Sequence, residues 1–147
     1  MRFKEALKRQ VVGTSDASQV GRIKRFVVSP TEHRITAVVL DKTPGDGVLL
    51  DWSDLQAFGR DAVTVRSAET FRGPHGQDEE LAVKGKLDLL GKLVLTERGD
   101  GVGELEDVDF DAQTGEITAL QTTREEIRGD RLLGIGTYAV VVSAPER

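Results

Sequence analysis

The chain contains an internal repeat, because residues 10–38 align without a gap on residues 92–120 at a constant offset of 82. Seven aligned pairs are identical: Val12/Val94, Thr14/Thr96, Val20/Val102, Gly21/Gly103, Ile35/Ile117, Thr36/Thr118 and Ala37/Ala119. Five more pairs exchange one apolar residue for another, so the apolar pattern is duplicated as well. A repeat of this kind indicates that the chain is built from two copies of one structural unit.

A second aligned block shows where each copy ends. Residues 54–67 match residues 131–144 at an offset of 77, so the second copy is five residues shorter between the two blocks. The first copy has KTPGDG in that stretch, a cluster typical of a turn, and the difference therefore falls in a loop. Between the copies, AETFRGPHGQDEE has no apolar period, as expected of a linker. We divide the chain into a first repeat at 1–73, a linker at 74–86 and a second repeat at 87–147.

Both copies show the pattern of short β-strands, because segments rich in Val, Ile, Leu and Thr are interrupted by turn residues. In the first copy we predict strands at Gln10–Gly13, Val20–Ser29, His33–Asp41, Gly47–Trp52 and Ala62–Arg66. In the second copy we predict strands at Lys92–Leu95, Val102–Asp111, Glu116–Thr122, Glu126–Ile127 and Ala139–Ser143. The apolar spacing near Gly21 and Gly103 departs from strict alternation, which predicts a β-bulge at each glycine. These features predict an all-β fold with short helical turns at most.

Several motifs recur in both copies: V-G-x-[IL] in one strand, a turn written SPTEHRI or DAQTGEI, a late glycine (Gly59 and Gly136), and a closing strand AVxV. In this combination the sequence resembles the PRC-barrel family, the small β-barrel of the photosynthetic reaction centre H subunit and of the ribosome maturation factor RimM. The resemblance covers nearly the whole chain and implies two tandem β-barrels. It also implies a non-enzymatic module that binds protein partners.

The composition excludes much of enzyme chemistry. The chain has no Cys and only two His, so disulfides, thiolate nucleophiles and the usual zinc sites are excluded. His33 takes the turn position that Gly115 holds in the second copy, where φ is expected to be positive, and we interpret it as a turn residue. His75 lies beside acidic residues in the linker, which we interpret as solvated. We predict no catalytic residue, no cofactor and no metal site.

Four other motifs have structural interpretations. Ser53, next to Asp54, is expected to cap the turn SDLQAFG, because no histidine base is placed beside it. Trp52 is expected in the core, since it closes the apolar run VLLDW. The segment RGDGVG is predicted to be a hairpin, because strand residues rather than a helix follow it. The segment DFDAQTGEI lacks the Gly and Glu that a calcium loop needs, so it is also predicted to be a hairpin.

The two copies carry opposite net charge. Residues 1–73 have 12 Lys+Arg and 9 Asp+Glu, a net charge of +3, and residues 74–147 have 8 and 16, a net charge of −8. Several aligned pairs are direct inversions, and these are the candidate interaction residues: Arg22, Lys24, Arg25 and Arg34 in the first copy, and Glu104, Glu106, Asp107 and Glu116 in the second. We hypothesise that the two sets dock, within one chain as a pseudo-twofold pair or between chains, and that salt weakens the contact.

These observations lead to an expected function. No apolar run approaches the ~18 to 20 residues that cross a bilayer, and the N-terminus lacks a signal-peptide pattern, so we expect a cytoplasmic protein. We expect a non-enzymatic binding or scaffold module with a protein partner and no membrane insertion. One alternative is an RNA- or ribosome-associated factor that uses the basic face of the first repeat. The other is a small-molecule or metal sensor at the cleft between the barrels.

Overall fold

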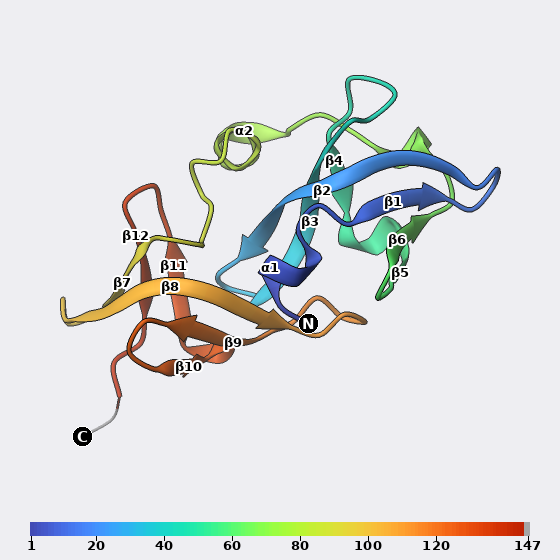
Figure 1. The fold of residues 1–147 in the computed structure, drawn as a ribbon. Helices are drawn as coiled ribbons and strands as arrows, with labels where there is room; N and C mark the ends of the chain where they lie inside the picture. The colour runs from blue at the N-terminus through green and yellow to red at the C-terminus, as the bar shows by residue number, and fades with distance from the viewer. Residues whose placement is uncertain (146–147) are drawn as a thin grey trace.

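The computed structural model describes residues 1–145 and contains two six-stranded sheets, one from each repeat (Figure 1). The first repeat comprises α1 (Phe3–Ala6), β1 (Gln10–Gly13), β2 (Ser18–Ser29), β3 (Arg34–Asp41), β4 (Leu49–Asp51), η1 (Trp52–Asp54), β5 (Leu55–Phe58), β6 (Ala62–Val65) and η2 (Ala68–Thr70). Helix α2 (Gly76–Val83) follows, and then β7 (Leu93–Thr96), β8 (Gly101–Phe110), β9 (Ile117–Thr122), β10 (Glu126–Arg128), η3 (Gly129–Arg131), β11 (Leu132–Ile135) and β12 (Ala139–Val142). The sheet orders, β4-β3-β2-β1-β6-β5 and β10-β9-β8-β7-β12-β11, are the same topology built twice.

All ten predicted strands are present, with ends within two residues of the predicted ones. The prediction misses β5 and β11, because each is short and contains a bulge, at Gln56 or at Leu133, that breaks the alternating pattern. The capping role expected of Ser53 is wrong: Ser53 lies inside η1, whose N-cap position is Asp51 and has no side-chain cap. The predicted linker also contains α2, the longest helix of residues 1–145.

Neither sheet closes into a barrel, so the barrel prediction is confirmed for the repeated β architecture but not for closure. The end strands of each sheet are joined by one 3-10 turn, η1 or η3, without being hydrogen-bonded to each other. In the first repeat the free edge of β4 is already used, because Leu49 and Arg72 exchange two backbone hydrogen bonds of 2.9 Å. The chain that leaves the first repeat therefore occupies backbone N–H and C=O groups of β4 that would have to pair with β5 if the sheet closed into a barrel.

The predicted β-bulges are confirmed. Between the pairs Val11↔Gly21 and Val12↔Gln19, the strand β2 has one extra residue, Val20, and β8 is irregular at the matching place around Gly103. Gly103 has φ +101°, a conformation that favours glycine. The V-G motif therefore marks a bend that each sheet needs.

The structural equivalence of the first strands differs by one residue from the sequence alignment. Gln10 lies beside Ala62 and Leu93 lies beside Ala139, and these alanines are equivalent residues of β6 and β12. Gln10 therefore corresponds to Leu93, at an offset of 83 rather than 82. The cause is the hairpin that follows, which is one residue shorter in the second repeat.

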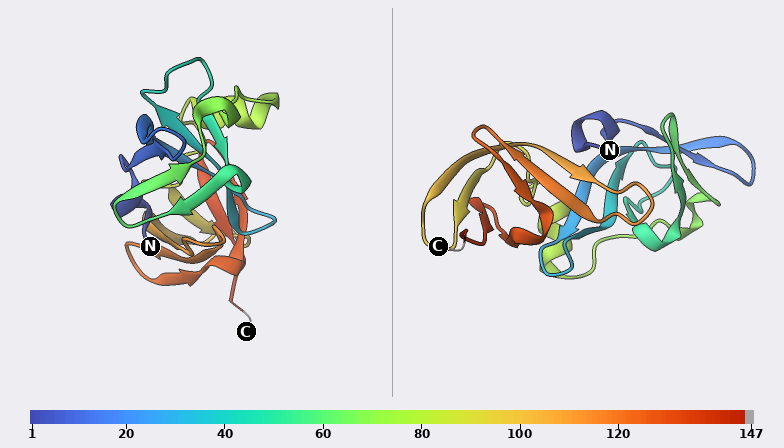
Figure 2. Two further views of the ribbon diagram at one scale, coloured as in Figure 1. Left: turned by 90° about the vertical axis from the view of Figure 1, so that its right-hand side faces the viewer. Right: turned by 90° about the horizontal axis from the view of Figure 1, so that it is seen from below.

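The two repeats lie side by side and share one hydrophobic core, with α2 on the outside of their junction (Figures 1 and 2). Aromatic rings from both repeats meet there: Phe26 stacks on Phe3 at 4.2 Å between ring centroids, and Trp52 stacks on Phe58 at 5.7 Å. Phe110 of the second repeat packs edge-on against Trp52 and Phe58. The core position predicted for Trp52 is confirmed, since it is 8% exposed. No helix among residues 1–145 is long and apolar enough to cross a membrane.

Candidate functional site

Equivalent turns of the two repeats meet at a pseudo-twofold axis. The amide of Ile35 donates to the carbonyl of Gly115 at 2.8 Å, and the amide of Ile117 donates to the carbonyl of His33 at 2.7 Å. Ile35 and Ile117 are equivalent residues of the two repeats, and so are His33 and Gly115, so the two hydrogen bonds are equivalent to each other. Arg34 and Glu116 form the antiparallel bridge between them. The repeats are thus joined by backbone pairing at the centre and by apolar packing around it.

The turn residues behave as the sequence predicts, with φ of +56° at His33 and +79° at Gly115. The His33 side chain also has a role in the interface, because its Nε2 lies 2.9 Å from the carbonyl oxygen of Leu132 in the second repeat. A Cβ on Gly115 would lie 3.0 Å from the Trp52 ring, so glycine is needed for space as well as for conformation. Both turns are therefore structural elements of the repeat interface.

Two of the predicted basic residues, Arg22 and Arg25, find partners outside the predicted acidic set. Arg22 forms a two-pronged ion pair with Asp41 of its own repeat, at 3.1 and 3.0 Å, and this hydrogen bonding lowers the pKa of Asp41. Arg25 reaches the end of α2 and the start of the second repeat: its Nε lies 3.1 Å from the Asp88 carboxylate, and its Nη1 lies 3.5 Å from the carbonyl oxygen of Val83. Arg25 therefore stabilises the end of α2 instead of docking on β8.

The acidic set is also arranged differently from the hypothesis. Asp107 accepts the backbone amide of Lys4 at 3.1 Å, whereas Glu104 and Glu106 are exposed. Within residues 1–145, the ion pairs do not join the basic and acidic sets. Of the four aligned inversions, only Arg34 and Glu116 come together, and they do so through the backbone. Charge docking between chains stays a prediction.

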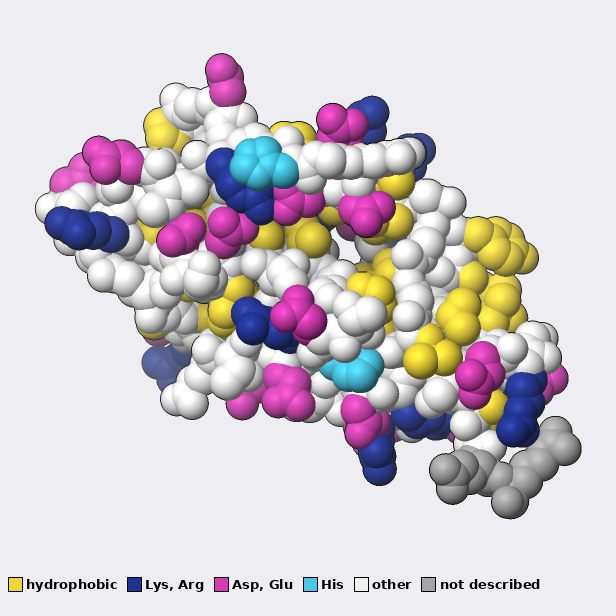
Figure 3. Space-filling model, turned by 180° about the vertical axis from the view of Figure 1, so that it is seen from behind, with side chains coloured by type: hydrophobic (Ala, Val, Ile, Leu, Met, Phe, Trp, Pro, Cys, Tyr) yellow, Lys and Arg dark blue, Asp and Glu magenta, His cyan; other side chains and the backbone are white. Residues whose placement is uncertain are grey.

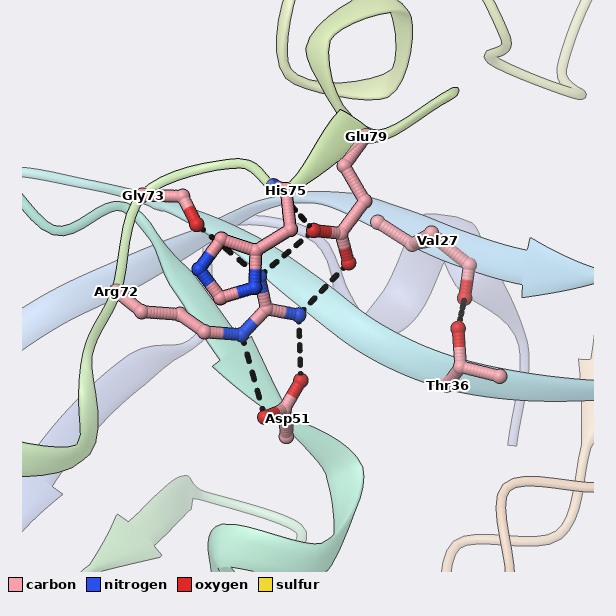
Figure 4. A network of polar contacts seen from close by, with 7 residues as sticks. All are labelled: Val27, Thr36, Asp51, Arg72, Gly73, His75 and Glu79. Carbon is pink, nitrogen blue, oxygen red and sulfur yellow. Dashed lines mark hydrogen bonds and ion pairs between the residues drawn. The ribbon is translucent and has the colours of Figure 1, made fainter. Parts of the chain in front are cut away.

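A second cluster of charges fixes the other end of α2 (Figure 4). Arg72 donates to Asp51 at 2.8 and 3.3 Å and to Glu79 at 2.7 Å for each carboxylate oxygen. The backbone amide of His75 also donates to Glu79, at 2.7 Å, and this places His75 at the start of the helix. The hydrogen bonds from Arg72, with that from His75, lower the pKa of Glu79 to about 2. Arg72 and Arg25 together hold α2 against the first repeat, which fixes the path of the linker.

A groove of about 180 Å³ lies at the repeat junction beneath α2, where Figure 3 shows a hollow near the centre of the molecule. Its lining includes Val28 of β2, Ala82 of α2 and Ile135 of β11, together with the acidic residues Asp78 and Asp88. The cleft expected between the repeats therefore exists. Among residues 1–145, no three His, Asp or Glu side chains gather as a metal site.

The outer surface of strands β7, β12 and β11 is apolar, and Figure 3 shows hydrophobic side chains gathered over the second repeat near the C-terminus. We call this surface the apolar face, and its residues are Leu93, Leu95, Leu133, Tyr138 and Val141. Leu95 and Val141 are neighbours across the parallel β7–β12 pair. Leu133 is 46% exposed at the bulge of β11, and Tyr138 is 77% exposed in the following turn. Within residues 1–145, these two are the exposed large apolar side chains.

The first repeat has a polar surface at the same place. Gln10, Gln56, Thr64 and Asp61 take the positions of Leu93, Leu133, Val141 and Tyr138, and Val12 takes that of Leu95. Gln56 even accepts a hydrogen bond from the hydroxyl of Thr14, at 2.7 Å. Sequence reasoning missed the apolar face because it compared the repeats for shared apolar positions and for inverted charges, and not for positions where a polar residue of the first repeat becomes apolar in the second. The alignment at offset 77 already contained the signal, since it places Leu133 on Gln56 and Tyr138 on Asp61.

A comparison with protein-family models finds the same model twice along the chain. The PRC-barrel domain model matches residues 1–71 and again residues 87–144. A search of curated proteins finds no match. The two matched segments correspond to the two sheets described above.

Proposed function

The chain belongs to the PRC-barrel domain family, and on that basis we propose that it is a non-enzymatic scaffold that binds a protein partner through the apolar face of its second repeat. The observation that carries the proposal is the exposure of Leu133 and Tyr138 on a surface whose other members are also apolar. Contiguous apolar surface that stays exposed on a folded chain is a mark of an interaction site.

The energetics favour a protein partner for this face. Fully burying one large apolar side chain gains roughly 1.5–3 kcal/mol, and a tyrosine adds a hydroxyl that hydrogen-bonds at the rim. Tyr138 stands out of the turn between β11 and β12, the position of an anchor residue that enters a partner's pocket. The first repeat has the same sheet topology with Gln, Thr and Asp at these positions, so the topology does not require the apolar residues.

The nucleic-acid alternative receives less support. Two arginines of the basic strand are already engaged, Arg22 by Asp41 and Arg25 by Asp88, so each offers less positive charge to a phosphate. Lys24 is the basic residue of this strand that is left exposed. One exposed lysine on the strand, with the exposed Lys4 and Lys8 of the preceding segment, is a weak basis for binding a polyanion.

Site-specific photocrosslinking tests the proposed function. A photoreactive amino acid replaces Tyr138 in one variant and Asp61, the equivalent turn residue of the first repeat, in a matched control. We expect a discrete protein adduct in native cells from position 138 and none from position 61. We also expect the adduct to disappear when Leu93→Gln, Leu133→Gln and Val141→Thr introduce the residues of the first repeat. Adducts that are the same from both positions, or that survive the triple substitution, would contradict the proposal.

A further inference from the structure

One edge of the apolar face carries a negative charge that no ion pair compensates within residues 1–145. Glu104 of β8 lies directly opposite Leu93 of β7, so its side chain is on the same surface as the apolar face. Glu106 follows on the same strand, at a second bulge, and both side chains are exposed. The surface therefore passes from apolar strands to an acidic strand without a break.

The first repeat shows that this charge is not needed for folding. There Arg22 holds the position of Glu104, and Asp41 neutralises it across the β2–β3 pair. In the second repeat the position of Asp41 is taken by Thr123, whose hydroxyl accepts the backbone amide of Glu104 at 3.1 Å. The Glu104 carboxylate thus forms no ion pair within residues 1–145, and the same holds for Glu106.

A nearby cation does not neutralise these carboxylates. Arg124 follows β9, and its Nη1 lies 3.4 Å from the carbonyl oxygen of Gly101, at the start of β8. Asp107, which follows Glu106 directly, is a further acidic residue of the strand. The edge of the apolar face toward β8 is therefore acidic.

This inference rests on the proposed function. We propose that the partner presents a basic, amphipathic segment. Its apolar side chains cover the apolar face, and its Lys or Arg side chains meet Glu104 and Glu106. Opposite charges at the rim of an apolar contact set its orientation and its partner choice, and they accelerate association. A segment with alternating apolar and basic residues matches both halves of the surface.

The charge distribution also argues against two other occupants. A second copy of this chain, docked by the same face, would bring together two surfaces from segments, residues 74–147, that each carry a net charge of −8. An anionic lipid surface would be repelled for the same reason. A basic protein segment satisfies the apolar and the acidic parts together.

Selection of random peptides displayed on phage tests this inference on the full chain. Three proteins are used as targets: the unmodified chain, the polar variant Leu93→Gln/Leu133→Gln/Val141→Thr, and the charge variant Glu104→Arg/Glu106→Lys. Both variants carry residues that the first repeat has at the equivalent positions, so they are expected to fold, and circular dichroism checks this. The polar variant keeps every charge and so removes peptides that bind by charge alone.

Peptides that bind the polar variant are removed first. From the remaining peptides, we expect the unmodified chain to select those in which Lys or Arg flank apolar residues. Synthetic copies should bind the charge variant about tenfold or more weakly, with less dependence on salt. The charge variant should instead select Asp or Glu at the flanking positions. Peptides that are apolar without any charge preference would refute the basic partner and leave the proposed function standing. Peptides that do not distinguish the unmodified chain from the polar variant would refute both.

Discussion

Replacing Gly115 with Ala tests whether the pseudo-twofold contact holds the two repeats together. Gly115 has φ +79°, and a Cβ placed on it would lie 3.0 Å from the Trp52 ring and 3.1 Å from the carbonyl oxygen of Ile35. Both neighbours belong to the first repeat and both are fixed in the interface. The substitution therefore perturbs the junction between the repeats without touching either sheet interior.

The expected loss of stability has two parts. An alanine in the left-handed region costs roughly 1–2 kcal/mol. Forcing a methyl group against the Trp52 ring and a backbone carbonyl adds roughly 1–3 kcal/mol, because neither can move freely. Gly91→Ala is the matched control: Gly91 has φ +87° and open space around it, so it isolates the backbone part. The loss of folding stability caused by Gly115→Ala should therefore exceed that caused by Gly91→Ala by roughly 1–3 kcal/mol.

Urea denaturation measures this difference. Trp52 is the single tryptophan and is buried at the junction, so its fluorescence reports on the repeat contact, and circular dichroism at each urea concentration reports on the sheets. With a urea dependence of about 2 kcal/mol per molar, the midpoint for Gly115→Ala should lie about 0.5–1.5 M below that for Gly91→Ala. Equal midpoints for the two variants would refute the reasoning, because the close contact with Trp52 would then have no energetic effect.

Two further predictions concern the charges that hold α2. Because the folded-state pKa of Glu79 is about 2, below its ordinary value of 4.5, the Arg72–Glu79 contact contributes stability above about pH 4.5 that is lost as the pH falls toward 2. Arg72→Gln should therefore reduce the loss of stability over that pH window in urea titrations, and an unchanged pH profile would argue against the contact. Arg25→Gln should lower the urea midpoint by an amount equivalent to about 1–2 kcal/mol, since it removes contacts to Asp88 and Val83. Lys24→Gln, its exposed neighbour, should change stability by less than about 0.5 kcal/mol, and equal effects of the two substitutions would contradict the role of Arg25.

Much of the local structure follows from the sequence because its causes are local. The position of Gly115 in a short turn requires a positive φ, and the alignment then assigns the same conformation to His33. The irregular apolar spacing around Gly21 and Gly103 requires a bulge wherever these residues lie in a strand. Such features depend on neighbours along the chain, and the repeat supplies each of them twice.

The partners of the charged residues do not follow from the sequence. Aligning the repeats pairs Arg25 with Asp107, yet the fold places Arg25 beside Asp88, at the start of the second repeat, and Asp107 beside the amide of Lys4. A long charged side chain contacts whichever opposite charge or carbonyl the backbone brings within reach, and that is a property of the chain path. Charge inversion between repeats therefore did not identify which ions meet.

By itself the sequence determined ten of the twelve strands of the duplicated β architecture, the bulges and the turn conformations, because apolar periodicity and backbone sterics act over a few residues. Only the tertiary structure decided that the sheets remain open, that the repeats meet through Ile35 and Ile117 with their neighbours, and that within residues 1–145 Arg22 has an ion-pair partner while Glu104 has none. These outcomes depend on groups far apart along the chain, such as Leu49 with Arg72. They are decided by which strand edges and apolar surfaces the folded backbone leaves free.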